Sequence, residues 1–383
     1  MPPVRILHFH STFAPGGKEL RAARLMNAFG PRATHTIVSS MPGELGAQAA
    51  VDAQIKLHFP LDPPPLTGKP ALARYEALAR FMIGHDLVLT YNWGAMDAVL
   101  ARRMHAKDCP PLIHHEDGFN EDEAGGLKRE RNWFRRLALP GAHRLVVPSS
   151  LLEGIALRTW KQPRARVQRI ANGIDVARFA GAPKRGALPG FAPRKGELVV
   201  GTIAGLRRVK NIPRLVEAFA TLPPSARLAI VGDGPERPAI AAAASRLGVS
   251  DRVHVAGFVA NPARFVGLFD IFALSSDSEQ APISVIEAMA TGRPVVAPAV
   301  GDIANMLSAE NRPFIVAPGD AAALGQALRT LASDPALCKS VGEANRARAA
   351  AAFDERAMIT AYAALYADAV GRPGALLDAA AQS

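Results

Sequence analysis

The sequence predicts an α/β protein made of two doubly wound, parallel-sheet domains. Its 383 residues exceed the roughly 250–300 residues at which a single hydrophobic core stops growing. Short apolar runs alternate with amphipathic stretches, which is typical of parallel strands covered by helices on both faces. This alternation is interrupted once, by a Pro/Gly/basic segment at residues 179–197 that has the composition of a linker.

We expect the first domain at residues 1–178 and the second at residues 198–355. In the first, the predicted strands are 4–9, 34–39, 87–90, 111–115 and 144–148, and the predicted helices are 17–29, 71–83, 93–105 and 150–160. In the second, the strands are 198–203, 227–231, 253–256, 271–274, 295–297 and 314–316, and the helices are 211–221, 235–247, 262–268 and 282–290. An Ala-rich helical region follows from 320 to about 370, and we expect residues 356–383 to cross back to the first domain and end in a tail. Ligands of such sheets bind beyond the carboxyl ends of the strands, so both domains should face a shared cleft.

The composition narrows the class of protein. A hydrophobic content of 49% fits a folded protein, and no apolar run is long enough to cross a membrane. No signal peptide precedes the first predicted strand, and Cys109 and Cys338 are too far apart in sequence to indicate a disulfide framework or a zinc site. We therefore expect a cytoplasmic protein, with peripheral association with the inner face of the membrane as a further hypothesis.

The net charge is +11, with a pI near 10.1. This balance favours anionic partners such as nucleotide-sugars, lipid headgroups or nucleic acid. An Arg-rich composition typical of a GC-rich genome explains the charge equally well. No nucleic-acid-binding motif accompanies it, so we do not expect a nucleic-acid partner.

Residues 271–297 are the most informative stretch. A strand leads into a Ser/Asp/Glu loop and then a helix, and Gly-Arg-Pro ends that helix before the next strand. Glu279 lies on the loop and Glu287 in the helix, eight residues apart. Between them are the free N–H groups of a helix N-terminus, a suitable seat for phosphate. The predicted helix tip comprises Ala281, Pro282, Ile283 and Ser284.

This segment, with the following Ala-Met-Ala-x-Gly-x-Pro-Val-Val, resembles the Glu-x7-Glu motif of the retaining glycosyltransferases of family 4 (glycosyl transferases group 1). A bare Glu-x7-Glu spacing is common by chance, so the whole segment carries the resemblance. The resemblance implies a GT-B fold of two Rossmann-like domains. It also implies that Glu279 contacts the donor sugar and Glu287 the ribose. The donor would be a nucleoside diphosphate sugar, with no cofactor and no bound metal, and no metal-ligand spacing is present.

Three further segments of the second domain resemble the family. Lys210 matches a lysine that neutralises the donor diphosphate, but Gly205 stands where an arginine is usual, so Arg207 or Arg208 is the candidate replacement. Gly232 belongs to a Gly-x-Gly-Pro turn, for which a tight turn before a helix is an alternative explanation. Gly257 and Phe258 follow a strand at the place where the family's backbone meets the nucleotide base.

In the first domain, Gly16 and Gly17 resemble the family's Gly-Gly-x-Glu loop near the donor phosphates and the acceptor, the alternative being an ordinary turn. His114, His115 and Asp117 lie at the C-terminal end of a predicted strand, on a segment where related enzymes carry a histidine that contacts the donor sugar. Asp117 falls at that position, and either histidine could serve instead. The structural alternative is a polar cluster that caps the next helix.

The helix predicted at 126–137 mixes Lys and Arg with Trp133, Phe134 and Leu137. It could rest on an anionic membrane surface, or it could bury an apolar stripe and expose a basic face.

We interpret the chain as a retaining, hexosyltransferase-type glycosyltransferase. It would move a sugar from a nucleotide-sugar to a glycan, a glycolipid or another hydroxyl acceptor in polysaccharide or cell-envelope biosynthesis. The alternatives are a nucleotide-sugar epimerase or a phosphorylase of the same fold, although no pyridoxal-phosphate lysine segment is seen. A non-catalytic nucleotide-sugar or glycan-binding protein is the third hypothesis, against which the Glu279/Glu287 pair counts.

Overall fold

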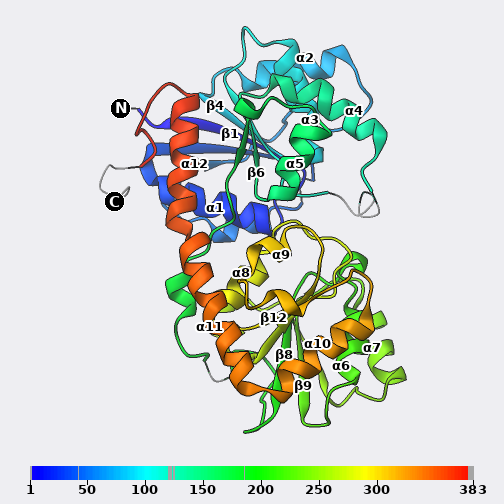
Figure 1. Ribbon diagram of the computed structural model, residues 1–383. Coiled ribbons are helices and arrows are strands. Elements are labelled where there is room, and N and C mark those ends of the chain that lie inside the picture. The colour runs from blue at the N-terminus through cyan, green and yellow to red at the C-terminus, as the bar shows by residue number, and fades with distance from the viewer. Residues whose placement is uncertain (1, 42, 120–122, 124–125, 185, 378–383) are drawn as a thin grey trace. The chain divides into compact units, whose positions relative to one another are not determined.

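The computed structural model describes residues 2–41, 43–119, 123, 126–184 and 186–377. The chain divides into two compact units, coloured by residue number in Figure 1. Unit 1 comprises Met1–Asn172 and Arg356–Ser383, and unit 2 comprises Gly173–Glu355. The last six residues of the expected tail, 378–383, lie outside the described residues.

Unit 1 contains a seven-stranded parallel sheet in the order β3-β2-β1-β4-β5-β6-β7. Its strands are β1 Val4–His10, β2 Ala33–Ser39, β3 Leu57–His58, β4 Leu87–Tyr91, β5 Leu112–His115, β6 Arg144–Val147 and β7 Val167–Arg169. Its helices are α1 Gly17–Phe29, α2 Leu72–Met82, α3 Met96–Met104, α4 Arg129–Ala138, α5 Ser150–Arg158 and, from Arg356 onward, α12 Glu355–Ala369. Short 3-10 helices occur at Gly30–Arg32, Gly46–Ala50, Trp93–Ala95, Leu139–Gly141 and Arg164–Arg166.

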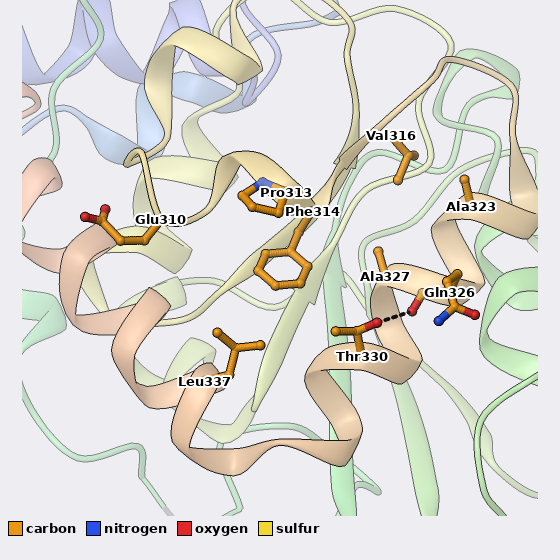
Figure 2. Close-up of a pocket in the computed structure, with 9 residues that line it drawn as sticks. All are labelled: Glu310, Pro313, Phe314, Val316, Ala323, Gln326, Ala327, Thr330 and Leu337. Carbon is orange, nitrogen blue, oxygen red and sulfur yellow. Dashed lines mark hydrogen bonds between the residues drawn. The ribbon is translucent and has the colours of Figure 1, made fainter.

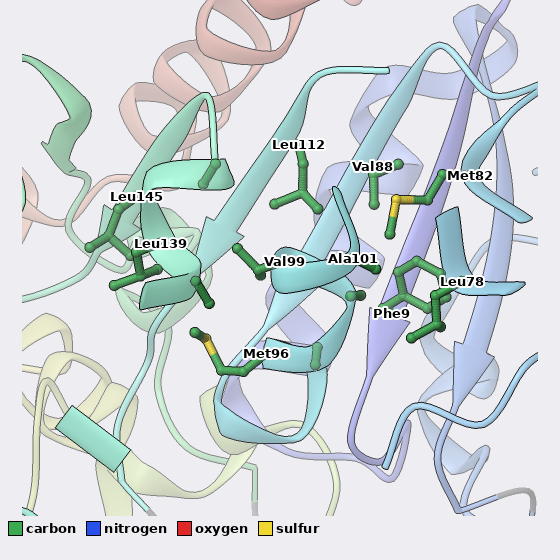
Figure 3. Packing of buried hydrophobic residues seen from close by; sticks show 14 of the residues in the cluster. Phe9, Leu78, Met82, Val88, Met96, Val99, Ala101, Leu112, Leu139 and Leu145 are labelled. Carbon is green, nitrogen blue, oxygen red and sulfur yellow. The ribbon is translucent and has the colours of Figure 1, made fainter. Parts of the chain in front are cut away.

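Alternating strand residues build a separate core on each face of this sheet. Val88 of β4 and Leu112 of β5 pack with α2 and α3 on one face, as Figure 3 shows. Leu89 and Ile113 pack on the other face with α1 and α12. The same alternation directs the next two residues of β5, His114 and His115, to opposite faces.

Unit 2 contains a six-stranded parallel sheet in the order β10-β9-β8-β11-β12-β13. Its strands are β8 Leu198–Ile203, β9 Ala226–Val231, β10 Val253–Gly257, β11 Ile271–Ala273, β12 Val295–Pro298 and β13 Ile315–Val316. Its helices are α6 Ile212–Ala220, α7 Arg237–Arg246, α8 Ile283–Ala290, α9 Ile303–Met306, α10 Ala321–Ser333 and α11 Pro335–Ala352. Its 3-10 helices are η7 Val176–Phe179, η8 Arg208–Lys210, η9 Pro262–Arg264, η10 Val266–Leu268 and η11 Arg312–Phe314.

Two predicted elements differ from the structure. The helix expected at 262–268 is two single 3-10 turns, η9 and η10. The segment expected as a linker is packed onto unit 2: Leu188 and Phe191 are buried, and the carbonyl of Pro189 lies 2.8 Å from Nε2 of His254. Two apolar anchors in a Pro/Gly-rich segment are sufficient to fix it against the edge strand β10.

The first and last residues of unit 2, where the chain enters and leaves it, lie side by side. Ile174 forms a parallel bridge with Asp354, and a Cβ at Gly173 would lie only 2.8 Å from Cα of Glu355. Within the described part of the chain, no helix has both the length and the apolar character needed to cross a membrane.

Candidate active site

The site predicted in unit 2 is built from two loops at the carboxyl edge of the sheet. One follows β8 and contains Lys210, and the other follows β11 and contains Glu279. The amide of Asp277 donates to the carbonyl of Val209 at 2.8 Å, and the hydroxyl of Ser275 donates to the carbonyl of Lys210 at 3.1 Å. These bonds hold the two loops together although about 65 residues separate them in sequence.

Lys210 and Glu279 are in direct contact. Nζ of Lys210 lies 2.6 Å from Oε1 of Glu279, and the hydroxyl of Ser276 donates to the same oxygen at 2.7 Å. Only 15% of the lysine side chain and 8% of the glutamate side chain are exposed. The structure therefore pairs two residues that the sequence analysis had assigned to different parts of a ligand.

Helix α8 begins beside this pair. Its N-cap residue is Pro282, whose side chain makes no cap hydrogen bond. Ala281, Pro282, Ile283 and Ser284 are all partly exposed, whereas Glu287, one turn further along, is buried. The arrangement leaves the tip of α8 open to a ligand, with one carboxylate on the loop before it and another within the helix.

Gly301 fixes the backbone of the Glu279 loop, and the sequence analysis did not identify it. Gly301 has φ +60°, and a Cβ there would lie 2.3 Å from the carbonyl oxygen of Glu279. The next residue, Asp302, donates its amide to the carbonyl of Gln280 at 2.8 Å. A glycine shortly after a buried strand was the signal that could have identified this close approach.

The Gly232 turn also has a packing role. A Cβ at Gly232 would lie 1.8 Å from the carbonyl oxygen of Ala204, and the amide of Leu206 donates to the carbonyl of Asp233 at 2.8 Å. The amide of Gly232 donates to the carbonyl of Gly257, whose φ is +75°. These contacts support the tight-turn explanation for Gly232.

The remaining candidates of unit 2 lie at the surface. Gly205 is exposed and a Cβ there would meet only Nε of Arg207 at 3.8 Å, so packing does not require glycine. Arg207 and Arg208 are exposed, and Phe258 is 70% exposed. An exposed ring of this size beside β10 is available for stacking.

In unit 1, Gly16 and Gly17 form the start of α1. A Cβ at Gly16 would lie 2.7 Å from Oε2 of Glu19, and no side-chain cap bond is made at this helix start. Glu19 is buried and forms an ion pair with Lys18. Burial lowers the pKa of Lys18 to about 8.

Asp117 is held by Arg21 of α1, a residue that the sequence analysis did not identify. The guanidinium engages both carboxylate oxygens, with Nη2 at 2.8 Å from Oδ2, and it also donates to Oδ1 of Asn172 at 3.0 Å. The amide of Asp117 donates to Oδ1 of Asn92 at 2.7 Å. Burial alone would raise the pKa of Asp117, but the charge and hydrogen bonds of Arg21 outweigh it and hold this pKa below its ordinary value.

His114 and His115 are core residues, and this favours the structural alternative over contact with a sugar. The relative exposures are 0% for His114 and 1% for His115. Nδ1 of His114 lies 2.8 Å from the hydroxyl of Thr90, and Nε2 of His115 lies 2.7 Å from the hydroxyl of Tyr366 on α12. Both belong to strand β5 itself, so the pleat directs them into the two cores rather than beyond the strand end.

A second buried arginine, Arg135 of α4, holds the loop after β5 from the other face. Its Nε donates to Oε2 of Glu116 at 3.1 Å, and Nη1 lies 3.3 Å from Oε1 of Glu123. The expectation of a solvated basic face on this helix is wrong for Arg135, which is fully buried. Phe134 packs against Trp93, whereas Trp133 is 67% exposed.

One surface hollow of unit 2 lies elsewhere (Figure 2), and none of the predicted site residues lines it. It is lined by Glu310, Pro313, Phe314, Val316, Ala323, Gln326, Ala327, Thr330 and Leu337. Both cysteines are free, Cys109 in unit 1 and Cys338 in unit 2.

Comparison with protein families assigns this arrangement to a class. Residues 189–348 match the model described as glycosyl transferases group 1, and residues 15–178 match that of glycosyltransferase family 4. Two Rossmann-like parallel-sheet domains are the GT-B fold class, which confirms the predicted fold. The chain belongs to the family 4 (group 1) glycosyltransferases, a family of sugar-transferring enzymes.

Several curated proteins are similar to the chain. N-acetyl-alpha-D-glucosaminyl L-malate synthase of Bacillus anthracis is 26% identical over 54% of this chain and 55% of its own length. The 2-deoxystreptamine glucosyltransferase of Streptomyces kanamyceticus is 31% identical over 44% of this chain and 45% of its own. These two alignments span about half of each relative. The lipopolysaccharide core biosynthesis glycosyltransferase LpsE of Rhizobium meliloti is 25% identical over 95% of this chain and 99% of its own.

Solved structures share the fold. Sucrose-phosphate synthase from Thermosynechococcus elongatus has a TM-score of 0.76 at 22% identity, covering 95% of this chain and 98% of that one. Anabaena HepE in complex with UDP has a TM-score of 0.77 at 20% identity, covering 95% and 100%.

Proposed function

We propose that the chain is a retaining glycosyltransferase that uses a nucleoside diphosphate sugar as its donor. The observation that carries this proposal is the Lys210–Glu279 contact beside the uncapped tip of α8. An ammonium and a helix N-terminus together suit a diphosphate, and a carboxylate beside them suits the hydroxyls of a sugar. HepE, which shares the fold, has been solved with UDP and with UDP-glucose.

Each residue then has a role in unit 2. Lys210 and the α8 tip stabilise the negative charge that develops on the departing diphosphate. Glu279 accepts hydrogen bonds from the donor sugar and Glu287 from the ribose hydroxyls, while Phe258 stacks on the base. Arg207 and Arg208, which are exposed near Lys210, supply the charge that Gly205 cannot.

Retention follows if the acceptor attacks the face from which the diphosphate leaves. The bond from the anomeric carbon to the phosphate oxygen breaks, and the acceptor oxygen forms a bond to the same carbon. The acceptor's proton passes to the departing phosphate, so no protein nucleophile is needed. In unit 1, the ionised Asp117 is a fixed acceptor for a sugar hydroxyl. A glycan or glycolipid acceptor of cell-envelope biosynthesis agrees with the similarity to LpsE, a glycosyltransferase of lipopolysaccharide core biosynthesis.

A donor screen tests the proposal. UDP-, GDP-, ADP- and dTDP-sugars are compared by thermal shift, and the best donor is then assayed for nucleoside diphosphate release. Lys210→Ala should lower turnover at least about tenfold, the loss expected when a charged group that stabilises a transition state is removed. Arg246→Ala, on α7, serves as the control for loss of a positive charge.

Three results would contradict the proposal. No stabilisation by any donor would remove the donor role, and an inverted anomeric configuration by NMR would remove retention. Conversion of the donor sugar without an acceptor would favour the epimerase alternative.

We also propose that α4 contacts anionic membrane. Its outward residues include Arg129, Trp133, Arg136 and Leu137, all exposed, so an aromatic ring is flanked by two cations. Trp133→Ala should reduce co-sedimentation with phosphatidylglycerol vesicles, whereas Leu72→Ala, at an exposed apolar residue of α2, should not. Equal binding to pure phosphatidylcholine vesicles, or an unchanged Trp133→Ala, would contradict this role.

A further inference from the structure

The Lys210–Glu279 contact affects how tightly unit 2 binds the donor substrate relative to the nucleoside diphosphate product. The ammonium that the proposed function assigns to the diphosphate is already paired with a carboxylate at 2.6 Å. A diphosphate that takes this ammonium must therefore separate it from Glu279. The exchange leaves a mostly buried carboxylate close to an incoming anion.

The Glu279 loop has little freedom to relieve this conflict by moving its backbone. The carbonyl of Glu279 packs on Gly301, where a Cβ would lie 2.3 Å away, and Gln280 accepts the amide of Asp302. The hydroxyl of Ser276 also anchors Oε1 of Glu279. The carboxylate therefore stays near the diphosphate position, and only its side-chain rotamer can adapt.

A sugar on the diphosphate changes this balance. Its hydroxyls donate hydrogen bonds to the carboxylate that has lost its lysine, and such charge-assisted bonds are stronger than neutral ones. A free nucleoside diphosphate has no sugar hydroxyl next to its terminal phosphate and leaves the carboxylate without a new partner.

We propose that Glu279 is a specificity-determining residue that weakens binding of the free nucleoside diphosphate and so favours the sugar-bearing donor over the spent product. This inference rests on the proposed donor function of unit 2. It predicts that the same carboxylate strengthens binding of the donor and weakens binding of the product. A residue with a merely structural role would not change the two affinities in opposite directions.

Calorimetric titration of the full chain tests it, with UDP, GDP, ADP and dTDP and the corresponding glucose or mannose derivatives as probes. Glu279→Gln keeps the shape of the side chain but removes its charge. We expect this variant to bind the free diphosphate about tenfold more tightly, since a nearby like charge is removed. We expect it to bind the sugar derivative about tenfold more weakly, since a charge-assisted bond becomes a neutral one.

Two controls accompany this variant. Glu343→Gln removes the same charge from a carboxylate paired with Lys339 on α11, and should change neither affinity. In the Lys210→Ala background, Glu279→Gln should give a smaller gain for the free diphosphate than in the wild-type chain, because only the repulsion is removed and no ion pair with Lys210 has to be separated. Circular dichroism establishes that each variant is folded.

The outcomes separate this inference from the proposed function. If the wild-type chain binds a diphosphate but Glu279→Gln binds it equally or more weakly, the inference is overturned and the donor function stands. If the gain is as large without Lys210 as with it, or appears in Glu343→Gln, the inference is also overturned. If no diphosphate or sugar derivative binds the wild-type chain, the proposed function itself is overturned, and this inference with it.

Discussion

Replacing Arg135 by methionine should destabilise the protein because it leaves a buried carboxylate without its cation. Arg135 and Glu116 are 0% and 1% exposed, and the guanidinium lies 3.1 Å from Glu116. Glu123 keeps a second partner, Arg131, at 2.9 Å, so Glu116 carries most of the loss. Removing one partner of a buried ion pair costs about 3–5 kcal/mol.

The guanidinium also lies 5.0–5.3 Å from the ring centres of Trp93, Phe119 and Trp160. A methionine side chain retains contact with these rings but not the cation–π attraction. Because the same guanidinium makes all these contacts, their energies do not add, and we keep ~3–5 kcal/mol as the expected loss in free energy of unfolding.

Urea unfolding followed by tryptophan fluorescence measures this loss, since Trp93 and Trp160 lie in the affected cluster. Arg164→Met is the matched control, because Arg164 is largely exposed and pairs with Glu153 at 2.6 Å. Its loss should stay below about 1 kcal/mol. Adding Glu116→Gln to Arg135→Met should restore much of the stability. The reasoning is refuted if Arg135→Met loses no more than Arg164→Met, or if the second substitution restores nothing.

Three further predictions concern buried groups and close contacts. Burial lowers the pKa of His35 and of His115 to about 3. The contribution of these neutral imidazoles to the free energy of unfolding is complete above the ordinary histidine pKa. It is lost as the pH falls from about 6.5 toward 3, by ~1.4 kcal/mol per pH unit for each imidazole. Urea titrations at pH 7, 6 and 5 check this, and His115→Gln should lose less stability over that range than the wild type. Gly301→Ala should lower the unfolding free energy by at least ~1 kcal/mol more than Gly319→Ala, because both glycines have positive φ but only Gly301 has a backbone atom in the way of a Cβ; equal losses would show that the collision is relieved. Arg21→Gln should raise the pKa of Asp117. The unfolding free energy of the Arg21→Gln variant should then depend on pH between 4 and 7 more strongly than that of the double variant Arg21→Gln/Asp117→Asn. Parallel pH profiles for the two variants would contradict the pairing.

The period of the apolar pattern was sufficient to predict most of the fold. Runs such as Leu198–Ile203 and Leu87–Tyr91 are buried on both faces, and continuous hydrophobicity is the sequence signature of such strands. The edge strands β3 and β7 were missed because two or three residues carry too little pattern. The helix expected at 262–268 contains Gly267, which opposes a continuous helix, whereas Pro262 at its first position is compatible with a helix start.

The candidate site was predictable in its residue types but not in its pairing. Lys210 and Glu279 were identified from their motifs, but nothing local to either residue indicates the contact between them. Arg21 lies 96 residues from Asp117, and nothing in the sequence around either residue indicates the contact between them. His114 and His115 lie in the strand that was predicted for them, but nothing in the sequence indicates that the hydroxyls of Thr90 and Tyr366 engage them within the two cores.

These pairings change what the net charge of +11 implies. The net charge counts Arg21, Arg135 and Lys210 as positive charges that attract anions. Each of these residues, however, is paired with a carboxylate at 3.1 Å or less. The two arginines are buried behind their partners and do not attract a ligand. Lys210 differs because its pair is partly exposed and lies at an open helix tip, so an anion can reach it by exchange with Glu279. The affinity of unit 2 for a diphosphate is therefore set by the difference between two pairings of one ammonium, and a substitution at Glu279 should change that affinity more than one at the exposed Arg207 or Arg208.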